Sequence, residues 1–396
     1  MGMTKLNLIL TLSFVVGLLS CSSDEFSHNY SQEKDADNNM ISIMDASRLA
    51  VENYEMVFGT TRSACPDISN VEMFGNFEST RNSKSSELYG YYIINFGNCE
   101  GFAIVSADKR RDVSVFAISD EANLNLTDTV DNIGIRWYLN DYLGKIGNID
   151  NEIKLDTTIH DIIIPNLPVK TVYCERLLSG FLSQFGQDAP FNKYCFTKSG
   201  EQAVVGCMPL ATGTVMSLDE WPTTYEEYSF DWGEMKSNYY SDSWARIFEI
   251  IGRPKNENVN YGVTSTSASS STLKRTFKNL GYEGTSIDDF SISTVTGELR
   301  KSRAVIMLGQ NTSGSSGHAW VVDGGYSIYY DNTIAVEPQT DYYLHCVWGW
   351  YGTGNGYFYY RNNSLGGKPY SSDDGSDISV YTYNALKVVY GYTPKK

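Results

Sequence analysis

VVGCMPLATGTVM, residues 204–216, is the stretch that decides the fold of the second half of the chain. It predicts a helix that begins at Cys207, because Pro209 suits the first turn, where no backbone N–H is missed. Gly206 allows the chain to turn tightly into that helix. Unpaired N–H groups at a helix start lower a thiol pKa and favour the nucleophilic thiolate. The stretch therefore predicts a reactive Cys207, although a buried structural cysteine fits it equally well.

Four histidines are present, and a general base that works near neutral pH is most often a histidine. Only His318 and His345 lie in the same half of the chain as Cys207. His318 follows SGSSG (313–317) and opens the apolar run HAWVVDG (318–324), which predicts a strand that holds the imidazole at the edge of a cleft. Cysteine before histidine suits a Cys–His pair brought together by folding. A packed or solvent-facing histidine at a strand end is the alternative.

The string YLHCVWGW, residues 343–350, places two tryptophans around Gly349. Two large rings of this kind can wall a site and shield a histidine-centred hydrogen bond from water. For one of the two tryptophans we expect ordinary aromatic core packing instead.

Length and composition limit the classes of protein. A chain of 396 residues exceeds one small core, so two domains are expected. Hydrophobic residues make up 41% and charged residues 20%, which is typical of globular proteins, and the 29 tyrosines favour sheet. The net charge of −16 without a basic stripe excludes a nucleic-acid partner. His-Glu-x-x-His and paired Cys-x-x-Cys signatures are absent, so no metal and no cofactor are expected.

The first 21 residues predict export. Lys5 precedes an apolar run, residues 6–19, that is too short and too weakly flanked for a stable membrane span. LLSC (18–21) resembles a bacterial lipobox, in which Cys21 is acylated and becomes the mature N-terminus; a plain secretory signal is the alternative. The acidic stretch SSDE (22–25) resembles tags that send lipoproteins to the cell surface. We therefore expect an exported bacterial lipoprotein that is held on the outer membrane or cell surface, or released after processing.

Two segments with different patterns follow this signal. Residues 22–40 read as a polar tether, and residues 42–58 have the apolar spacing of a helix. Two β-type runs, 89–96 and 101–107, predict a hairpin, and residues 131–147 are helix-like. Pro165 and Pro168 mark a link between domains. The expected organisation is a signal peptide over 1–21, a tether and small α+β domain over 22–168, and a second domain over 169–396.

Several separated motifs of the second domain, in order, resemble the streptopain family of bacterial cysteine peptidases, which have a papain-like fold. They are SQFGQDAPFN (183–192), Gly206-Cys207, Tyr261-Gly262 with the Ser/Thr-rich run after it, Gly317-His318-Ala319 and Trp348-Gly349-Trp350. In the first domain, GFAIVSADKR (101–110) resembles the propeptide of the same family, which holds the catalytic histidine out of place until it is removed.

The resemblance implies a role for individual residues. Cys207 matches the nucleophile and His318 the base. Gln187 matches the oxyanion-hole glutamine, and Gln202 is a rival whose surroundings match less well. Trp348 matches the tryptophan beside the catalytic histidine, and the positions that match substrate contacts are Ser267 and Gly317.

Three departures from the family pattern stand out. Val347 occupies the place of an asparagine, and valine cannot orient an imidazole by hydrogen bonding. His318 must then rely on a backbone carbonyl or on packing against Trp348. Met208-Pro209 replaces smaller or β-branched residues, and Gly213 stands where a polar residue is often found.

The expected protein is thus an α+β protein, with a papain-like domain behind a small α+β prodomain. It is expected to be a cysteine endopeptidase zymogen that cleaves protein or peptide substrates and has its own prodomain as inhibitor. One alternative is a surface adhesin or binding lipoprotein that kept the fold without catalysis. Another is an inhibitor or chaperone-like protein built around the first domain, which should lack an intact Cys–His pair.

Overall fold

A computed structural model describes thirteen ranges of the chain. They are residues 40–59, 66–74, 90–97, 101–109, 114–125, 132–139, 155–157, 172–178, 185–238, 241–310, 317–330, 339–360 and 386–395. Residues 39–396 form one compact unit. We call the described residues between 40 and 157 the N-terminal segment and those between 172 and 395 the C-terminal segment. The predicted signal with Cys21, and the predicted domain boundary at residue 168, lie outside the described residues.

The N-terminal segment is a helix on an antiparallel sheet. Its elements are α1 (Ile43–Phe58), β1 (Ile68–Phe74), β2 (Tyr91–Phe96), β3 (Phe102–Ser106), β4 (Val115–Ser119), α2 (Ile133–Trp137) and β5 (Leu155–Thr157). Ser42 caps α1 by accepting a hydrogen bond from the Asp45 N–H. The apolar face of α1 packs on β2, β3 and β4, whose residues are all buried. The predicted helix and hairpin are confirmed.

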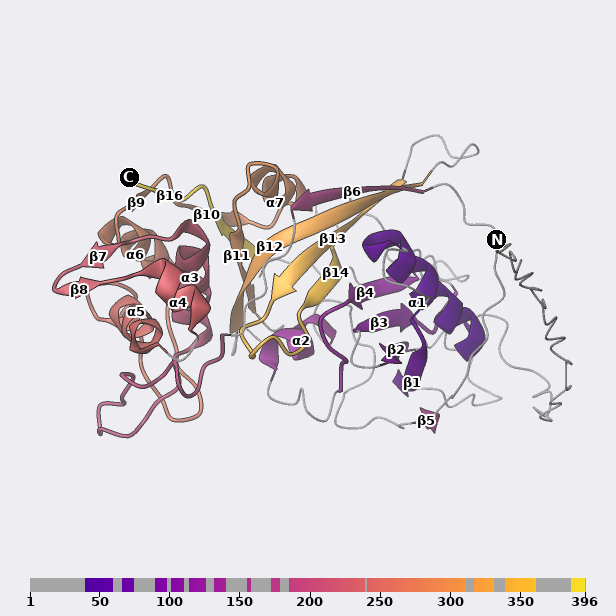
Figure 1. The fold of residues 1–396 in the computed structure, drawn as a ribbon, viewed down its shortest axis with the longest axis horizontal. Helices are drawn as coiled ribbons and strands as arrows, with labels where there is room; N and C mark the ends of the chain where they lie inside the picture. Colours follow the sequence, from indigo (N-terminus) through magenta and orange to yellow (C-terminus); the bar gives the residue numbers. More distant parts are fainter. Residues whose placement is uncertain are drawn as a thin grey trace, which may run out of the picture. The chain divides into compact units, whose positions relative to one another are not determined.

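The C-terminal segment begins with β6 (Val172–Leu178) and then carries most of the helices. These are α3 (Cys207–Asp219), α4 (Trp232–Ser237), α5 (Asp242–Gly252), α6 (Leu273–Asn279) and α7 (Ile292–Leu299). The short hairpin β7 (Thr224–Tyr225) and β8 (Tyr228–Ser229) lies between α3 and α4, and β9 (Tyr282–Glu283) pairs with β16 (Thr393–Pro394). Helix α3 packs against α5 and against two strands of the sheet, β11 (Val305–Gln310) and β12 (Gly317–Tyr330) (Figure 1).

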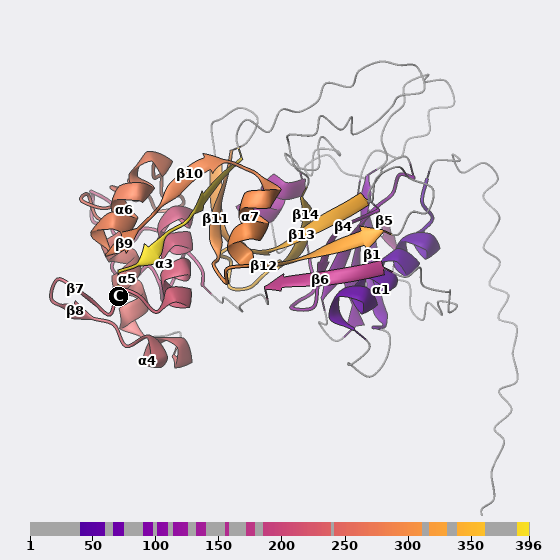
Figure 2. The same ribbon diagram turned by 90° about the horizontal axis from the view of Figure 1, so that it is seen from above.

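A single twelve-stranded sheet runs through both segments. Its order is β10-β15-β11-β12-β13-β14-β4-β3-β2-β1-β5, with β6 paired to β12. The strands not yet bounded are β10 (Ser286–Asp289), β13 (Gln339–Val347), β14 (Gly356–Tyr360) and β15 (Lys387–Tyr390). The segments join where β4 pairs antiparallel with β14, through Ala117 with Phe358 and Ile118 with Tyr357. Helix α7 packs on β11, β12, β15 and β6 at one end of the sheet (Figure 2).

The two faces of the C-terminal strands belong to different cores. Ala319, Val321 and Val347 pack with the helices α3, α5 and α6. On the other face, Trp320 and Trp348 pack in one cluster with the buried residues of the N-terminal segment. This alternation is the period of two that a strand imposes. The N-terminal segment therefore shares this face of the sheet with α7, whose Ile292, Val295 and Leu299 belong to the same cluster. The α+β fold class is confirmed.

Candidate active site

Cys207 is the first residue of α3. The residue before it, Gly206, has φ of 92°, a conformation that favours glycine, and a methyl group there would also lie 2.8 Å from Cγ2 of Thr266. The predicted helix start at Cys207 is therefore confirmed. Backbone N–H groups of Cys207, Met208 and Ala319 all lie close enough to the thiol to stabilise its anionic form.

The expected low pKa of Cys207 is wrong for this state of the protein. Burial raises the pKa of the thiol, and this effect outweighs the three N–H groups, which lower it. The carboxyl group of Glu257 also raises it. Cys207 is consequently held as a thiol, despite the helix start that the sequence identified.

His318 is the second residue of β12 and is buried. Its Nε2 lies 3.0 Å from the Trp348 carbonyl oxygen, so Nε2 carries the proton and donates it, since a carbonyl only accepts. Its Nδ1 has no hydrogen-bond partner among the described residues. Burial lowers the pKa of His318 to about 4, although the Trp348 carbonyl raises it. At neutral pH the imidazole is therefore uncharged.

The structure does not join Cys207 to His318 by a hydrogen bond. Cys207 approaches the strand at the Ala319 amide, on the face that α3 covers. The His318 ring lies with the tryptophans instead: its centroid is 6.1 Å from that of Trp320, 6.4 Å from Trp348 and 5.2 Å from Trp350. Cys207 and His318 lie on two elements that pack together, α3 and β12. Their side chains are not hydrogen-bonded to each other in this conformation.

Helix α2 of the N-terminal segment lies directly on His318 and Trp348. A methyl group added at Gly134 would overlap the Trp348 ring and lie 2.9 Å from Cδ2 of His318. Asn132 caps α2 by accepting from the Ile135 N–H, and its side-chain amide donates to the Thr353 carbonyl at 2.9 Å. The cap thus ties the helix to the C-terminal segment next to the histidine.

The peptide of Trp348 is fixed by a residue that the sequence did not reveal. Asn355 is buried, and its Oδ1 accepts from the Trp348 N–H at 3.0 Å, while the carbonyl of the same tryptophan holds His318. Val347 points into the helix-side core and makes no polar contact with the imidazole. Both alternatives that Val347 left for His318 are present, since the ring contacts the Trp348 carbonyl and stacks near the Trp348 ring. No motif in the sequence around Asn355 indicates that it fixes the Trp348 peptide.

The two candidate glutamines have different partners. The Gln187 carbonyl accepts from the Val205 N–H at 2.9 Å, which places Gln187 beside the approach to Cys207. Gln202 instead donates its side-chain amide to the Asn192 and Cys195 carbonyls, at 2.6 and 2.8 Å. Gln202 is thereby committed to bracing its own loop. The oxyanion role of Gln187 stays a prediction.

Ser267 belongs to a loop that borders Gly206. Its backbone pairs with Asn260, and the neighbouring Thr266 donates its hydroxyl to the Val204 carbonyl at 2.7 Å. Gly317 opens β12 opposite Gln310, where a methyl group would lie 2.9 Å from the Gly309 carbonyl oxygen. Both positions flank the segment around Cys207 and His318, and their contact with substrate stays a prediction.

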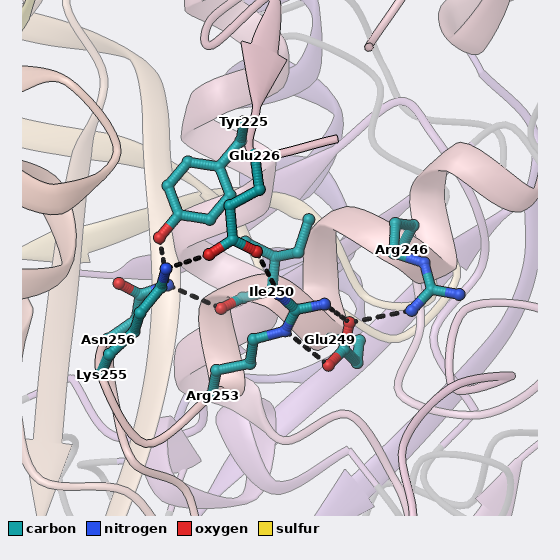
Figure 3. Close-up of polar contacts among 8 residues, drawn as sticks. All are labelled: Tyr225, Glu226, Arg246, Glu249, Ile250, Arg253, Lys255 and Asn256. Carbon is teal, nitrogen blue, oxygen red and sulfur yellow. Dashed lines mark hydrogen bonds and ion pairs between the residues drawn. The ribbon is translucent and has the colours of Figure 1, made fainter. Parts of the chain in front are cut away.

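An ionic network braces the turn that leads from α5 into this loop. Arg253 bonds Glu249 within α5 and Glu226 in the β7–β8 turn, and Lys255 also bonds Glu226 (Figure 3). Next to them, Asn256 is buried and donates to the Ile250 carbonyl at 2.7 Å. The turn therefore presents Glu257 to the inner side of α3 in a fixed position.

The described ranges offer neither a metal site nor a membrane-spanning helix. No cluster of three or more His, Cys, Asp or Glu side chains there is arranged to hold a metal ion. None of the helices in these ranges has the length and hydropathy needed to cross a membrane. His345 lies between two carboxylates, Asp323 and Glu121.

Two family models match separate parts of the chain. Residues 185–358 match the Peptidase C10 family, and residues 41–146 match the Spi protease inhibitor. The first match contains Cys207 and His318, and the second contains α1, α2 and β1 to β4.

Individual relatives are distant. The thiol protease/hemagglutinin PrtT of Porphyromonas gingivalis is 25% identical over 328 residues, which are 72% of this chain and 35% of that protein, so this chain spans about a third of the relative's length. A prointerpain A fragment of Prevotella intermedia, a cysteine mutant, has 18% identity and a TM-score of 0.49, over 82% of this chain and all of that one. Active interpain A of the same organism has 20% identity and a TM-score of 0.37, over 55% and 93%.

Proposed function

We propose that this chain is a cysteine peptidase of the Peptidase C10 family with an inhibitor-like prodomain, and the zymogen of an endopeptidase that uses Cys207 and His318 as a dyad. The observation that carries the proposal is the contact of α2 with the imidazole, because an inhibitor segment that packs on His318 explains why the dyad is unassembled. From here the N-terminal segment is called the prodomain and the C-terminal segment the catalytic domain.

The proposed reaction is hydrolysis of a peptide bond in protein or peptide substrates. The Cys207 thiolate attacks the carbonyl carbon, and the oxyanion accepts hydrogen bonds from the Cys207 N–H and the Gln187 amide. The C–N bond breaks as His318 protonates the leaving amine. His318 then takes a proton from water, which hydrolyses the thioester and releases the Cys207 sulfur.

Activation in this proposal requires that the prodomain leave. While α2 covers His318, the ring donates to the Trp348 carbonyl and stays neutral through burial. Once α2 is gone, the imidazole gains access to solvent and can turn toward Cys207, where it accepts the thiol proton. The resulting imidazolium and the N–H groups at the start of α3 then stabilise the thiolate.

The test is casein hydrolysis by the processed domain and self-processing by the full chain. We expect Cys207→Ala to abolish both while the fold is kept. Cys195→Ala is the matched control, because Cys195 is also a free thiol but is fully buried away from the site. Casein hydrolysis by the Cys207→Ala variant would refute the assignment.

A non-catalytic surface adhesin or binding lipoprotein remains the second candidate. The argument for this candidate is Val347, which stands in place of the family's asparagine and would mark a decayed catalytic site. His318 has a hydrogen-bond partner in the Trp348 carbonyl despite Val347, so the valine by itself does not mark a decayed site.

Export and lipidation also belong to the proposal. The support is the apolar run before Cys21 and the lipobox-like LLSC string (18–21). Metabolic labelling with a fatty acid should mark the full chain and not a Cys21→Ala variant. Absence of label from both would leave a plain secretory signal, and equal labelling of both would contradict acylation at Cys21.

A further inference from the structure

Two buried side chains and one partly buried side chain outside the dyad form a continuous ionic contact. His345 Nδ1 lies 2.6 Å from Asp323 Oδ1, and His345 Nε2 lies 2.7 Å from Glu121 Oε1. The side chains of His345 and Asp323 are 2% and 3% exposed, and that of Glu121 is 14% exposed. Carboxylates accept hydrogen bonds, so a ring that donates from both nitrogens is an imidazolium.

The charge of His345 follows from its surroundings. Burial alone lowers its pKa, but Asp323 and Glu121 outweigh burial and raise the pKa well above its usual value. The other titratable groups that face or adjoin the ring are the Tyr357 phenol on β14, with its ring 4.9 Å away, and the Cys346 thiol on its own strand. The protonated ring of His345 therefore faces a carboxylate on each side.

The three residues come from both parts of the zymogen. Asp323 is the extra residue of a bulge in β12, between the pairs Val322–Cys346 and Gly324–His345, so the catalytic domain builds the Asp–His pair alone. Glu121 follows β4 of the prodomain, two residues beyond the end of the strand that pairs with β14. The pair belongs to the catalytic domain, and its second carboxylate comes from the prodomain.

We propose that Asp323 and His345 form a carboxylate-binding site of the catalytic domain, that Glu121 occupies it in the zymogen, and that this contact locks the prodomain sheet onto β14. The proposal rests on the zymogen function proposed above. It assigns His345 a role in holding the prodomain, away from the chemistry at Cys207. The ligand in the zymogen is the carboxylate of Glu121, which lies just after the end of β4.

The proton on His345 makes the lock dependent on pH. With Glu121 in place the imidazolium has two anionic partners, and without it only Asp323, so the pKa of His345 is higher in the locked state than in the released state. The contact is therefore fully present below the pKa of the released state and is lost as pH rises through the pKa of the locked state. We expect release of the prodomain to become easier toward alkaline pH through this group.

The experiment uses the full chain with Cys207→Ala, so that no readout depends on peptidase activity. Imidazole NMR follows the titration of His345, and hydrogen exchange follows the β4 amides that pair with β14. We expect Glu121→Gln to lower the His345 pKa and to speed β4 exchange roughly tenfold or more, since removal of one partner of a buried charge pair weakens the contact strongly. Glu55→Gln, an acidic residue of α1 on the same prodomain, is the control and should change neither readout.

A second variant keeps the test decisive if Glu121→Gln folds poorly. Glu121→Asp retains the charge on a shorter stem, so it should restore part of the His345 pKa and of the β4 protection. A His345 titration that is the same in the parent and Glu121→Gln would overturn the carboxylate site. Unchanged β4 exchange would overturn the lock. Failure of the proposed function would instead appear in the casein test of the chain with Cys207 intact, and it would leave both of these readouts unchanged.

Discussion

At the scale of single residues, the protonation states of Cys207 and His318 agree with the proposed inactive state. Cys207 is a thiol because burial raises its pKa, and His318 is a neutral imidazole because burial lowers its pKa to about 4. A thiolate–imidazolium pair needs the opposite shifts in both groups. The apolar surroundings of His318 include Trp320 and Trp348, so a change in the cover of His318 changes its pKa.

Gln187 and Gln202 allow a matched comparison of the predicted oxyanion donor. In the processed enzyme, we expect Gln187→Ala to lower kcat about 10²–10³-fold with KM little changed, which is the usual effect of losing one oxyanion-hole donor. Gln202→Ala should instead lower stability by about 1–2 kcal/mol, because two backbone carbonyls lose their donor, and change kcat only slightly. Steady-state kinetics of the two variants shows which glutamine is the oxyanion donor. A larger fall in kcat for Gln202→Ala would reverse the assignment.

Glu257 supplies a prediction on pH and stability. Burial raises its pKa to about 8, and the Thr212 hydroxyl, with one proton, lies 2.9 Å from both its Oε1 and the Met208 carbonyl. A protonated Glu257 donates to Thr212, which leaves the threonine proton for Met208. The ordinary pKa of a glutamate is 4.5, so between pH 4.5 and about 8 Glu257 keeps a proton in the folded chain that it has released in the unfolded chain. The free energy of unfolding therefore falls as pH rises through this range.

Glu257→Gln should remove this loss, because an amide can donate to Thr212 without a proton equilibrium. We expect the variant to exceed its parent in free energy of unfolding by up to about 3 kcal/mol at pH 7, at about 1.4 kcal/mol per pKa unit. Urea unfolding in the Cys207→Ala background at about pH 5.5 and about pH 7.5 measures it. The difference between variant and parent should grow between the two pH values; a constant difference would show that Glu257 does not titrate in this range.

At the scale of elements, α2 is the part of the prodomain that acts on the site. Gly134 allows this helix to approach Trp348 and His318, since any side chain there would overlap the tryptophan ring. We expect Gly134→Ala to push α2 away and to speed self-processing of the full chain several-fold. Gly297→Ala in α7 is the control, because a methyl group there meets nothing within 4 Å. Densitometry of the processing time course measures both, and unchanged or slower processing of Gly134→Ala would contradict the role of α2.

The sequence predicted elements whose pattern is local. The helix over 42–58 and the strands around 91–96 and 102–106 follow from apolar spacing, and the start of α3 follows from Gly206 and Pro209. The pairing of β4 with β14 could not be predicted, because the edge of one sheet does not encode which distant edge it joins. Gly134, Asn355 and Glu121 were missed for the same reason: each gains its role from a residue far away in the chain.

The candidate site was predicted in part. The Cys207 and His318 positions came from motif order, and the need for a carbonyl near His318 came from Val347. The pKa of Cys207 was predicted in the wrong direction, because the helix start is visible in the sequence while the burial that outweighs it is not. Gly213, a departure from the family pattern, has a packing reason: a methyl group there would overlap the ring of Phe248 on α5.

At the scale of the whole molecule, the prodomain and the catalytic domain share one sheet and one core. The β4–β14 pair, the α2 contact and the Glu121–His345 ion pair all join them. The same cluster of buried side chains contains Phe102 and Ile118 of the prodomain and Trp320 and Phe358 of the catalytic domain. In the proposed activation, removal of the prodomain exposes the catalytic-domain side of this shared cluster and uncovers His318 in one event.

Labelling of Cys207 by an active-site-directed epoxide, before and after removal of the prodomain, tests the central claim most directly. Mass spectrometry distinguishes it from the other two thiols in the described ranges, Cys195 and Cys346, which are buried. We expect Cys207 alone to react, only after the prodomain has gone, and His318→Ala to suppress the reaction. Equal labelling of the full chain and the processed domain, or rapid labelling without His318, would contradict a latent Cys207–His318 dyad.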